Sequence, residues 1–146
     1  MNKAVVFSFL ILGISTAWSQ ADSVCNPSFE TGLTDWQNFA NNGAVATFDT
    51  SAVAATEGAV GVVIDIQDVS VGTCVLSACI ADMYANQTYR MSFWAKSDNA
   101  VEVLATISKA SPGYNNYASA NVVLSSDWVQ YEISGSVADD LLSDVR

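Results

Sequence analysis

Apolar and polar side chains alternate with a period of two along most of this chain, and no segment after residue 21 shows a convincing helical stripe. In residues 89–96 every second side chain is apolar, and the side chains between them include an arginine, a serine and a lysine. Residues 101–108 and 129–134 repeat this alternation. Such a pattern predicts β-strands that each bury one face and expose the other.

Further strands are predicted over 44–49 and 58–66, with a shorter one over 121–124. Residues 69–85 are apolar without a clear period, and they stay ambiguous. Turn-forming residues, such as those at 41–43, separate the strands. Roughly seven short strands with frequent turns indicate an all-β fold, an antiparallel β-sandwich.

The N-terminus has a different pattern, in which Lys3 precedes an apolar run over 4–14 and small residues follow at 17–21. The run is shorter than the ~20 residues that a membrane-spanning helix needs. A charged start, a short apolar middle and a small-residue end predict a secretory signal peptide over 1–21. We therefore expect one module over 22–146, a secreted protein (extracellular or periplasmic) and no membrane span.

The charge of the chain limits the classes of partner that it can bind, because the chain carries 15 acidic residues and a net charge of −10. The few cations are scattered, whereas nucleic-acid binding needs a basic patch, so no nucleic-acid partner is expected. The sequence has no histidine. This excludes Ser-His-Asp and Cys-His nucleophile pairs and histidine zinc ligands.

Three cysteines follow the predicted leader, namely Cys25, Cys74 and Cys79. In an oxidising compartment two of them are expected to form a disulfide, which leaves the third as a free thiol. Cys74 and Cys79 are five residues apart, so a regular strand would place them on opposite faces, although a bulge or turn would bring them together. Pairing of Cys25 with either is equally compatible with the spacing.

Three stretches together resemble one known family. They are residues 25–36 (CNPSFETGLTDW), 89–96 (YRMSFWAK) and 127–131 (DWVQY). In order and spacing they are similar to the carbohydrate-binding modules grouped with families four, nine and twenty-two. The resemblance covers roughly residues 24–138 and implies a jelly-roll sandwich similar to galactose-binding domains. It also implies non-catalytic binding of a polysaccharide or oligosaccharide by a module that often accompanies a secreted glycoside hydrolase.

The resemblance raises one expectation about the C-terminus. In similar modules the segment that corresponds to residues 136–146 is followed by further strands, the last of which pairs near the first strand. A sandwich without these strands leaves backbone groups and apolar core uncovered. We therefore interpret the sequence as a module that is incomplete at its C-terminus, either a monomer or part of a longer multidomain chain.

Sugars are recognised by exposed aromatic rings with amides and charged groups beside them, because a rigid ring provides contact area at a low entropy cost. Trp94 is the first candidate, since it alternates with the apolar face and lies among polar residues such as Arg90. The alternative is that this face meets the second sheet. The resemblance implies that Trp36 packs under the first loop, whereas Trp128, which opens a strand after a turn, is predicted to pack in the core or at a corner.

A second candidate is the polar loop over residues 111–117. Tyr114 and Tyr117 flank Asn115 and Asn116, and amides both donate and accept hydrogen bonds, as a sugar subsite requires. The alternative is that these tyrosines only cover an edge of the core.

The resemblance also implies a structural calcium ion near the start of the module. Glu30 is the candidate ligand, although the late aspartate that helps to hold this ion in similar modules would lie beyond Arg146. Calcium needs six to eight oxygen ligands, so a solvated glutamate is the simpler alternative.

Two other functions remain as alternatives. One is that the chain is the N-terminal piece of a glycosidase with its catalytic domain elsewhere, because no motif here places the pair of carboxylates that glycoside hydrolysis needs. The other is a surface or adhesion sandwich with a protein ligand, which would have the same composition.

Overall fold

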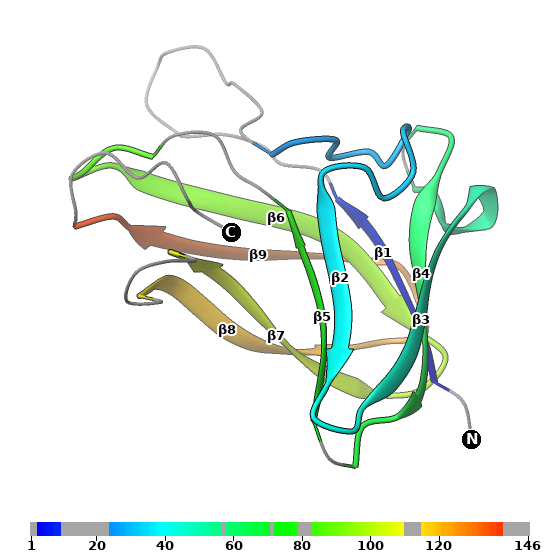
Figure 1. Cartoon of the computed structure of the whole chain (residues 1–146). Coiled ribbons are helices and arrows are strands. Elements are labelled where there is room, and N and C mark those ends of the chain that lie inside the picture. The colour runs from blue at the N-terminus through cyan, green and yellow to red at the C-terminus, as the bar shows by residue number, and fades with distance from the viewer. Residues whose placement is uncertain are drawn as a thin grey trace.

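The predicted all-β antiparallel sandwich is confirmed, and Figure 1 shows strands as its regular elements apart from one short 3₁₀ turn. The parts of this computed structural model that are described are residues 3–9, 24–56, 58–70, 72–78, 83–109 and 115–138. No α-helix occurs within these parts. The strands form two layers with the apolar residues between them.

One layer is a five-stranded sheet in which every neighbouring pair is antiparallel. In spatial order its strands are β3 (Val45–Ser51), β4 (Gly61–Asp68), β1 (Lys3–Phe9), β6 (Thr88–Ser97) and β9 (Val129–Ser136). The short 3₁₀ turn η1 (Ala52–Ala54) follows β3, and the Ser51 hydroxyl caps it by accepting a hydrogen bond from the Val53 N–H.

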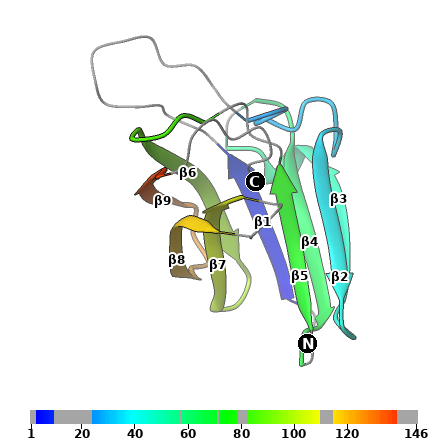
Figure 2. The ribbon, with the colours of Figure 1, turned by 60° about the vertical axis from the view of Figure 1, so that its left-hand side comes forward.

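The other layer consists of two separate antiparallel pairs. One pair is β2 (Trp36–Asn41) with β5 (Thr73–Ala78), and the other is β7 (Val101–Ser108) with β8 (Asn116–Leu124). Figures 1 and 2 show β7 and β8 against β6 and β9, and β2 and β5 beside β3 and β4.

The core lies where the inner faces of these layers meet. It includes Phe93 and Ala95 of β6, Val62 of β4 and Ile107 of β7, all 2% exposed or less. Of the apolar positions predicted to face inward in residues 89–96, Phe93 and Ala95 are buried and Tyr89 and Met91 pack against the core, while Ser92 of the other face is buried as well. Burial of such side chains contributes roughly 25 cal/mol for each Å² of apolar surface removed from water, which makes this contact the main stabilising term.

Tyr131 faces inward, as the alternation in residues 129–134 predicts, and its side chain connects three strands. Its ring stacks on Phe93 with 5.6 Å between the ring centroids, and its hydroxyl donates a hydrogen bond to the Val123 carbonyl over 3.0 Å. Because Phe93, Tyr131 and Val123 lie on β6, β9 and β8, this one side chain fixes the two layers relative to each other.

The structure differs from the sequence predictions at several strand boundaries. β8 begins at Asn116 instead of 121, and β4 begins at Gly61 instead of 58. Gly58 has a φ of +72°, which is a turn conformation and not an extended one. β2 was not predicted, and β5 lies in the stretch that the sequence left ambiguous.

The first loop is organised by Asn26. Its side-chain amide donates hydrogen bonds of 2.9 Å to the backbone carbonyls of Gly32 and Thr34. The backbone carbonyl of Asn26 accepts a 2.9 Å hydrogen bond from the Trp36 indole N–H. Asn26 also has a φ of 48°, a left-handed conformation that asparagine tolerates better than most residues.

This loop covers one end of the core, as the sequence predicts for Trp36. Trp36 is 8% exposed and packs on the fully buried ring of Phe29, with 4.6 Å between the ring centroids. Phe29 itself has a φ of 58°, a conformation that costs of order 1–3 kcal/mol in a bulky residue. The burial of both rings and the Asn26 hydrogen bonds offset this cost.

We predict that Asn26→Ala lowers the free energy of unfolding by about 1–3 kcal/mol. The change removes both side-chain hydrogen bonds and leaves an alanine in a left-handed conformation. Urea denaturation followed by tryptophan fluorescence measures the effect. The matched control is Asn121→Ala on the exposed face of β8, for which we expect a change within about 0.5 kcal/mol. Equal effects of the two changes would contradict the role of Asn26.

Candidate functional site

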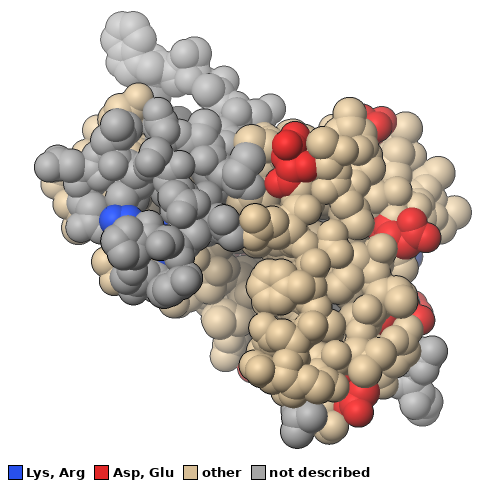
Figure 3. All heavy atoms as spheres, in the orientation of Figure 1, with Lys and Arg blue, Asp and Glu red and all other residues tan. Residues whose placement is uncertain are grey.

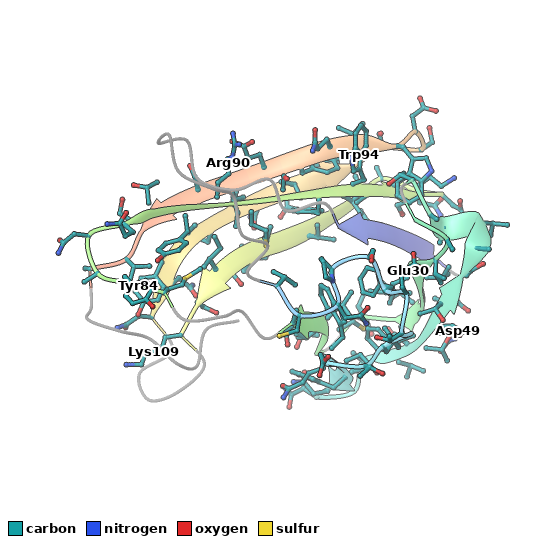
Figure 4. All side chains as sticks on the ribbon, turned by 90° about the horizontal axis from the view of Figure 1, so that it is seen from above. Glu30, Asp49, Tyr84, Arg90, Trp94 and Lys109 are labelled. Atoms are coloured by element: carbon teal, nitrogen blue, oxygen red, sulfur yellow. The ribbon has the colours of Figure 1, made fainter. Side chains whose placement is uncertain are left out.

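Trp94 and Arg90 lie on the outer face of the five-stranded sheet, where they alternate with the core residues of β6. Figure 4 shows both side chains on the side of β6 that faces away from the second layer. In the register of β6 with β9, Trp94 is opposite Gln130, and Ser92 is opposite Glu132. Phe93 and Ala95 of β6 belong to the core between the layers, so Trp94 and Arg90 lie on the face away from the second layer, where Ser92 between them is itself buried.

The charged groups near Trp94 have partners of their own. Arg90 and Glu132 form an ion pair of 3.3 Å, with side chains that are 37% and 52% exposed. An exposed pair of this kind contributes about 0–1 kcal/mol to stability, so its main effect is to neutralise the charge locally. Lys96 places its ammonium group 5.2 Å from the centre of the partly buried Trp128 ring, a cation–π distance.

This outer face therefore presents an indole ring beside groups that form hydrogen bonds. Trp94 is partly exposed, and Gln130 and Glu132 are exposed on the neighbouring strand. The ring supplies a flat apolar surface, and the Gln130 amide both donates and accepts hydrogen bonds. Such a surface has the chemistry to hold a ligand with alternating C–H and hydroxyl groups.

The second predicted set of residues lies elsewhere, at the start of β8 in the other layer. Asn115 and Asn116 are exposed, and the Asn115 carbonyl accepts a 2.9 Å hydrogen bond from the Lys109 N–H. Tyr117 is only partly exposed and packs against the core, which agrees with the alternative that it covers a core edge. Tyr114 lies outside the described residues.

The structure thus divides the predicted ligand-binding residues between two places. Figure 4 shows Lys109, which neighbours Asn115 through that hydrogen bond, at the lower left end of the view, whereas Trp94 lies on the upper edge, right of the centre. Tyr84 lies near the same end as Lys109, and it is 57% exposed. Its backbone N–H donates a 2.7 Å hydrogen bond to the Tyr89 hydroxyl. Sequence reasoning did not select Tyr84, because it lies in the stretch without a clear period.

Sequence reasoning also missed an aromatic residue on the outer face of β2 and β5. Phe39 is 43% exposed and lies between Gln37 and Asn41 on the same face of β2. The Thr73 hydroxyl donates a 2.6 Å hydrogen bond to the Asn41 side chain across the two strands. Figure 3 shows that the near face over β2 and β5 is mostly uncharged, with acidic side chains at its margin. A weak signal was present, because Gln37, Phe39 and Asn41 are spaced two residues apart and so share one face of a strand, but the two amides made the segment resemble a turn.

The side chain of Glu30, the predicted calcium ligand, joins two loops by a hydrogen bond. Its carboxylate accepts a 2.7 Å hydrogen bond from the Ala59 N–H and so links the first loop to the connection before β4. A Cβ added to Gly58 would collide with the same carboxylate oxygen. Within the described part of the chain, no three histidine, cysteine, aspartate or glutamate residues gather as a metal site. The calcium ion stays a prediction.

The cysteines are in different states. Cys25 is disulfide-bonded, and Cys74 on β5 is a free thiol, so the pairings that involve Cys74 are excluded. Cys79 lies outside the described residues. Burial raises the pKa of the Cys74 thiol, because the partly buried site disfavours the charged thiolate.

We predict that Cys74 reacts more slowly with a thiol reagent at pH 8 in the folded protein than in guanidinium chloride. The raised pKa reduces the thiolate fraction in the folded state, and the thiolate is the reactive species. Colour development with a disulfide reagent measures both rates. The variant Cys74→Ser should lose the slow native reaction, whereas equal native and denatured rates would contradict the burial argument.

Comparison with known proteins yields one match. Residues 21–140 match the family of a carbohydrate-binding domain, the group of families four and nine, so the chain belongs to this family. No curated protein and no solved structure matches. Among the described residues no helix is long and apolar enough to cross a membrane.

Proposed function

From this family membership we propose that the chain binds a neutral polysaccharide without catalysis, through the outer face of β6 and β9. The observation that carries the proposal is the position of Trp94, partly exposed on the outer face and opposite the Gln130 amide. A pyranose ring would lie with its C–H face on the indole, and Gln130, Glu132 and Arg90 would meet its hydroxyl groups.

The charge of the chain supports a neutral ligand over an acidic one. The net charge is −10, and one of the cations on this face, Arg90, is already paired with Glu132. A polyanion such as alginate would meet repulsion from the remaining acidic side chains, whereas an uncharged xylan or β-glucan would not. A single module of this kind is expected to bind with a dissociation constant of roughly micromolar to millimolar, or about −8 to −4 kcal/mol.

The composition of this face also supports binding over hydrolysis. Glycoside hydrolysis needs two carboxylates about 5–9.5 Å apart on either side of the scissile bond. On β6 and β9 the one carboxylate is Glu132, and it is held in the ion pair with Arg90. The wider proposal is a secreted accessory module that acts beside a glycoside hydrolase, and its support is the leader-like composition of residues 1–21.

We predict that Trp94→Ala weakens binding to a neutral polysaccharide at least about tenfold, or by about 1.4 kcal/mol, because it removes the stacking surface. Trp94→Phe should retain part of the affinity. Affinity electrophoresis against xylan, β-glucan, cellulose and alginate measures the effect, and thermal melting confirms that each variant is folded.

The matched control is Phe39→Ala, which removes the exposed aromatic ring on the other layer. Unchanged binding in this variant assigns the ligand to the face with Trp94. Loss of binding in Phe39→Ala but not in Trp94→Ala would instead place the ligand on β2 and β5. If no polysaccharide retards the folded wild-type protein, the proposal of sugar binding fails.

A further inference from the structure

The strands β2 and β3 are joined by a tight turn at Asn42 and Gly43. The Ala44 N–H donates a 3.0 Å hydrogen bond to the Asn41 carbonyl across this turn. The φ angles of Asn42 and Gly43 are 52° and 94°, which are the angles of a type I′ turn, and asparagine followed by glycine favours this turn. Because β2 pairs with β5 and β3 pairs with β4, the turn is a corner at which the chain passes from one layer to the other.

A second connection packs directly on this β2–β3 corner, which Figure 1 shows below the end of β2. Gly72, in the connection between β4 and β5, has a φ of +86°, and a Cβ added to it would collide with the backbone carbonyls of Asn41 and Asn42. The Thr73 hydroxyl donates its 2.6 Å hydrogen bond to the Asn41 side chain at the same place. The corner is therefore held on one side by its neighbours, while Asn42 itself is exposed.

An exposed asparagine that precedes glycine can react with its own backbone. The Gly43 nitrogen attacks the side-chain carbonyl carbon of Asn42, its proton passes through solvent to the leaving amide, and that amide departs as ammonia. A five-membered succinimide ring results, and water then opens one of the two ring carbonyls to give aspartate or isoaspartate. Glycine favours the attack because it has no Cβ to crowd the nitrogen. The sequence contains one such Asn-Gly pair.

The conformation of the corner opposes this reaction. Ring closure needs the Gly43 nitrogen and the Asn42 Cβ on the same side of the Asn42 Cα–C bond, because the five ring atoms are nearly coplanar. The first central residue of a type I′ turn has a ψ of about +30°, which directs the next nitrogen away from Cβ. The Cα–C bond must therefore rotate before the ring closes, and this rotation breaks the hydrogen bond between Ala44 and Asn41.

We propose that Asn42 is a self-modification site, at which the protein deamidates through opening of the β2–β3 corner. The reaction needs water and neither an enzyme nor a ligand, so it is independent of the proposed sugar binding. Each product adds a carboxylate to a chain whose net charge is already −10. Isoaspartate also adds a carbon to the backbone of the turn, against which Gly72 has no room even for a Cβ. Modification therefore loosens the corner that joins the two layers.

The test follows the full chain, folded in mildly alkaline buffer or unfolded in guanidinium chloride, by peptide mapping with mass spectrometry. Enzymatic methylation of isoaspartate provides a second readout. We expect Asn42 to react faster than any other asparagine in both samples, and at least about tenfold more slowly in the folded chain, because the corner must open first. The internal control is Asn38, which is exposed on β2 but is followed by the bulky Phe39.

Gly72→Ala is the variant that disturbs the corner, because its Cβ collides with the Asn41 carbonyl. The matched control is Gly32→Ala, which makes the same change at a φ of +68° with no atom within 4 Å of the added Cβ. We expect Gly72→Ala to bring the native rate at Asn42 close to the denatured rate and Gly32→Ala to leave it near that of the wild type. Thr73→Val removes the hydrogen bond to Asn41 with less disturbance and should give a smaller increase, so it serves if Gly72→Ala does not fold.

Three outcomes would overturn the proposal. Equal rates at Asn42 in the folded and the unfolded chain would show that the corner does not control the reaction. Faster modification of another asparagine in the folded chain, or no modification of Asn42, would assign the reaction elsewhere. Equal acceleration by Gly72→Ala and Gly32→Ala would show that general destabilisation sets the rate. Sugar binding is measured separately by affinity electrophoresis, so its failure would leave this result unchanged.

Discussion

The continuity of backbone hydrogen bonding across β4, β1 and β6 is the constraint on which the rest of this structure depends. Within the part of the chain that the structure describes, β1 lies between β4 and β6 and connects the two halves of the large sheet. Buried backbone groups that lack a partner are costly, so the hydrogen bonds that β1 makes to β4 and β6 stabilise the sheet in this structure. The core below it and the candidate ligand surface above it both rest on the strands that β1 holds in place.

β6 connects stability to function because its two faces serve different purposes. Phe93 and Ala95 fix the strand to the core, while Trp94 and Arg90, its neighbours in sequence, face outward. Tyr131 then anchors β9 to β8 and so sets the position of Gln130 beside the indole. A platform on a strand pair with this support is more rigid than one on a loop, which suits recognition of a flat sugar ring.

The sequence predicted the parts of the fold in which alternation is regular, and the inward and outward faces of β6 follow from it directly. β2 was missed because its amides at Gln37 and Asn41 hide the strand pattern and resemble a turn. The placement of Tyr117 against the core was weighed only as an alternative. The reason is that β8 begins at Asn116, five residues before its predicted start, so Tyr117 was assigned to a loop and not to a strand. Residues 3–9 form β1 in the structure, while the leader over 1–21 stays a prediction, since a leader and a central strand have the same apolar composition.

The free thiol of Cys74 has a consequence for the covalent integrity of the molecule. It shares a chain with the disulfide-bonded Cys25, and thiolates are the species that attack disulfides and change their pairing. Partial burial raises the pKa of the Cys74 thiol, which lowers the already small thiolate fraction at neutral pH further. Partial unfolding at β5 would remove this effect of burial on the thiol, so local opening of that strand is the step expected to speed thiol–disulfide exchange.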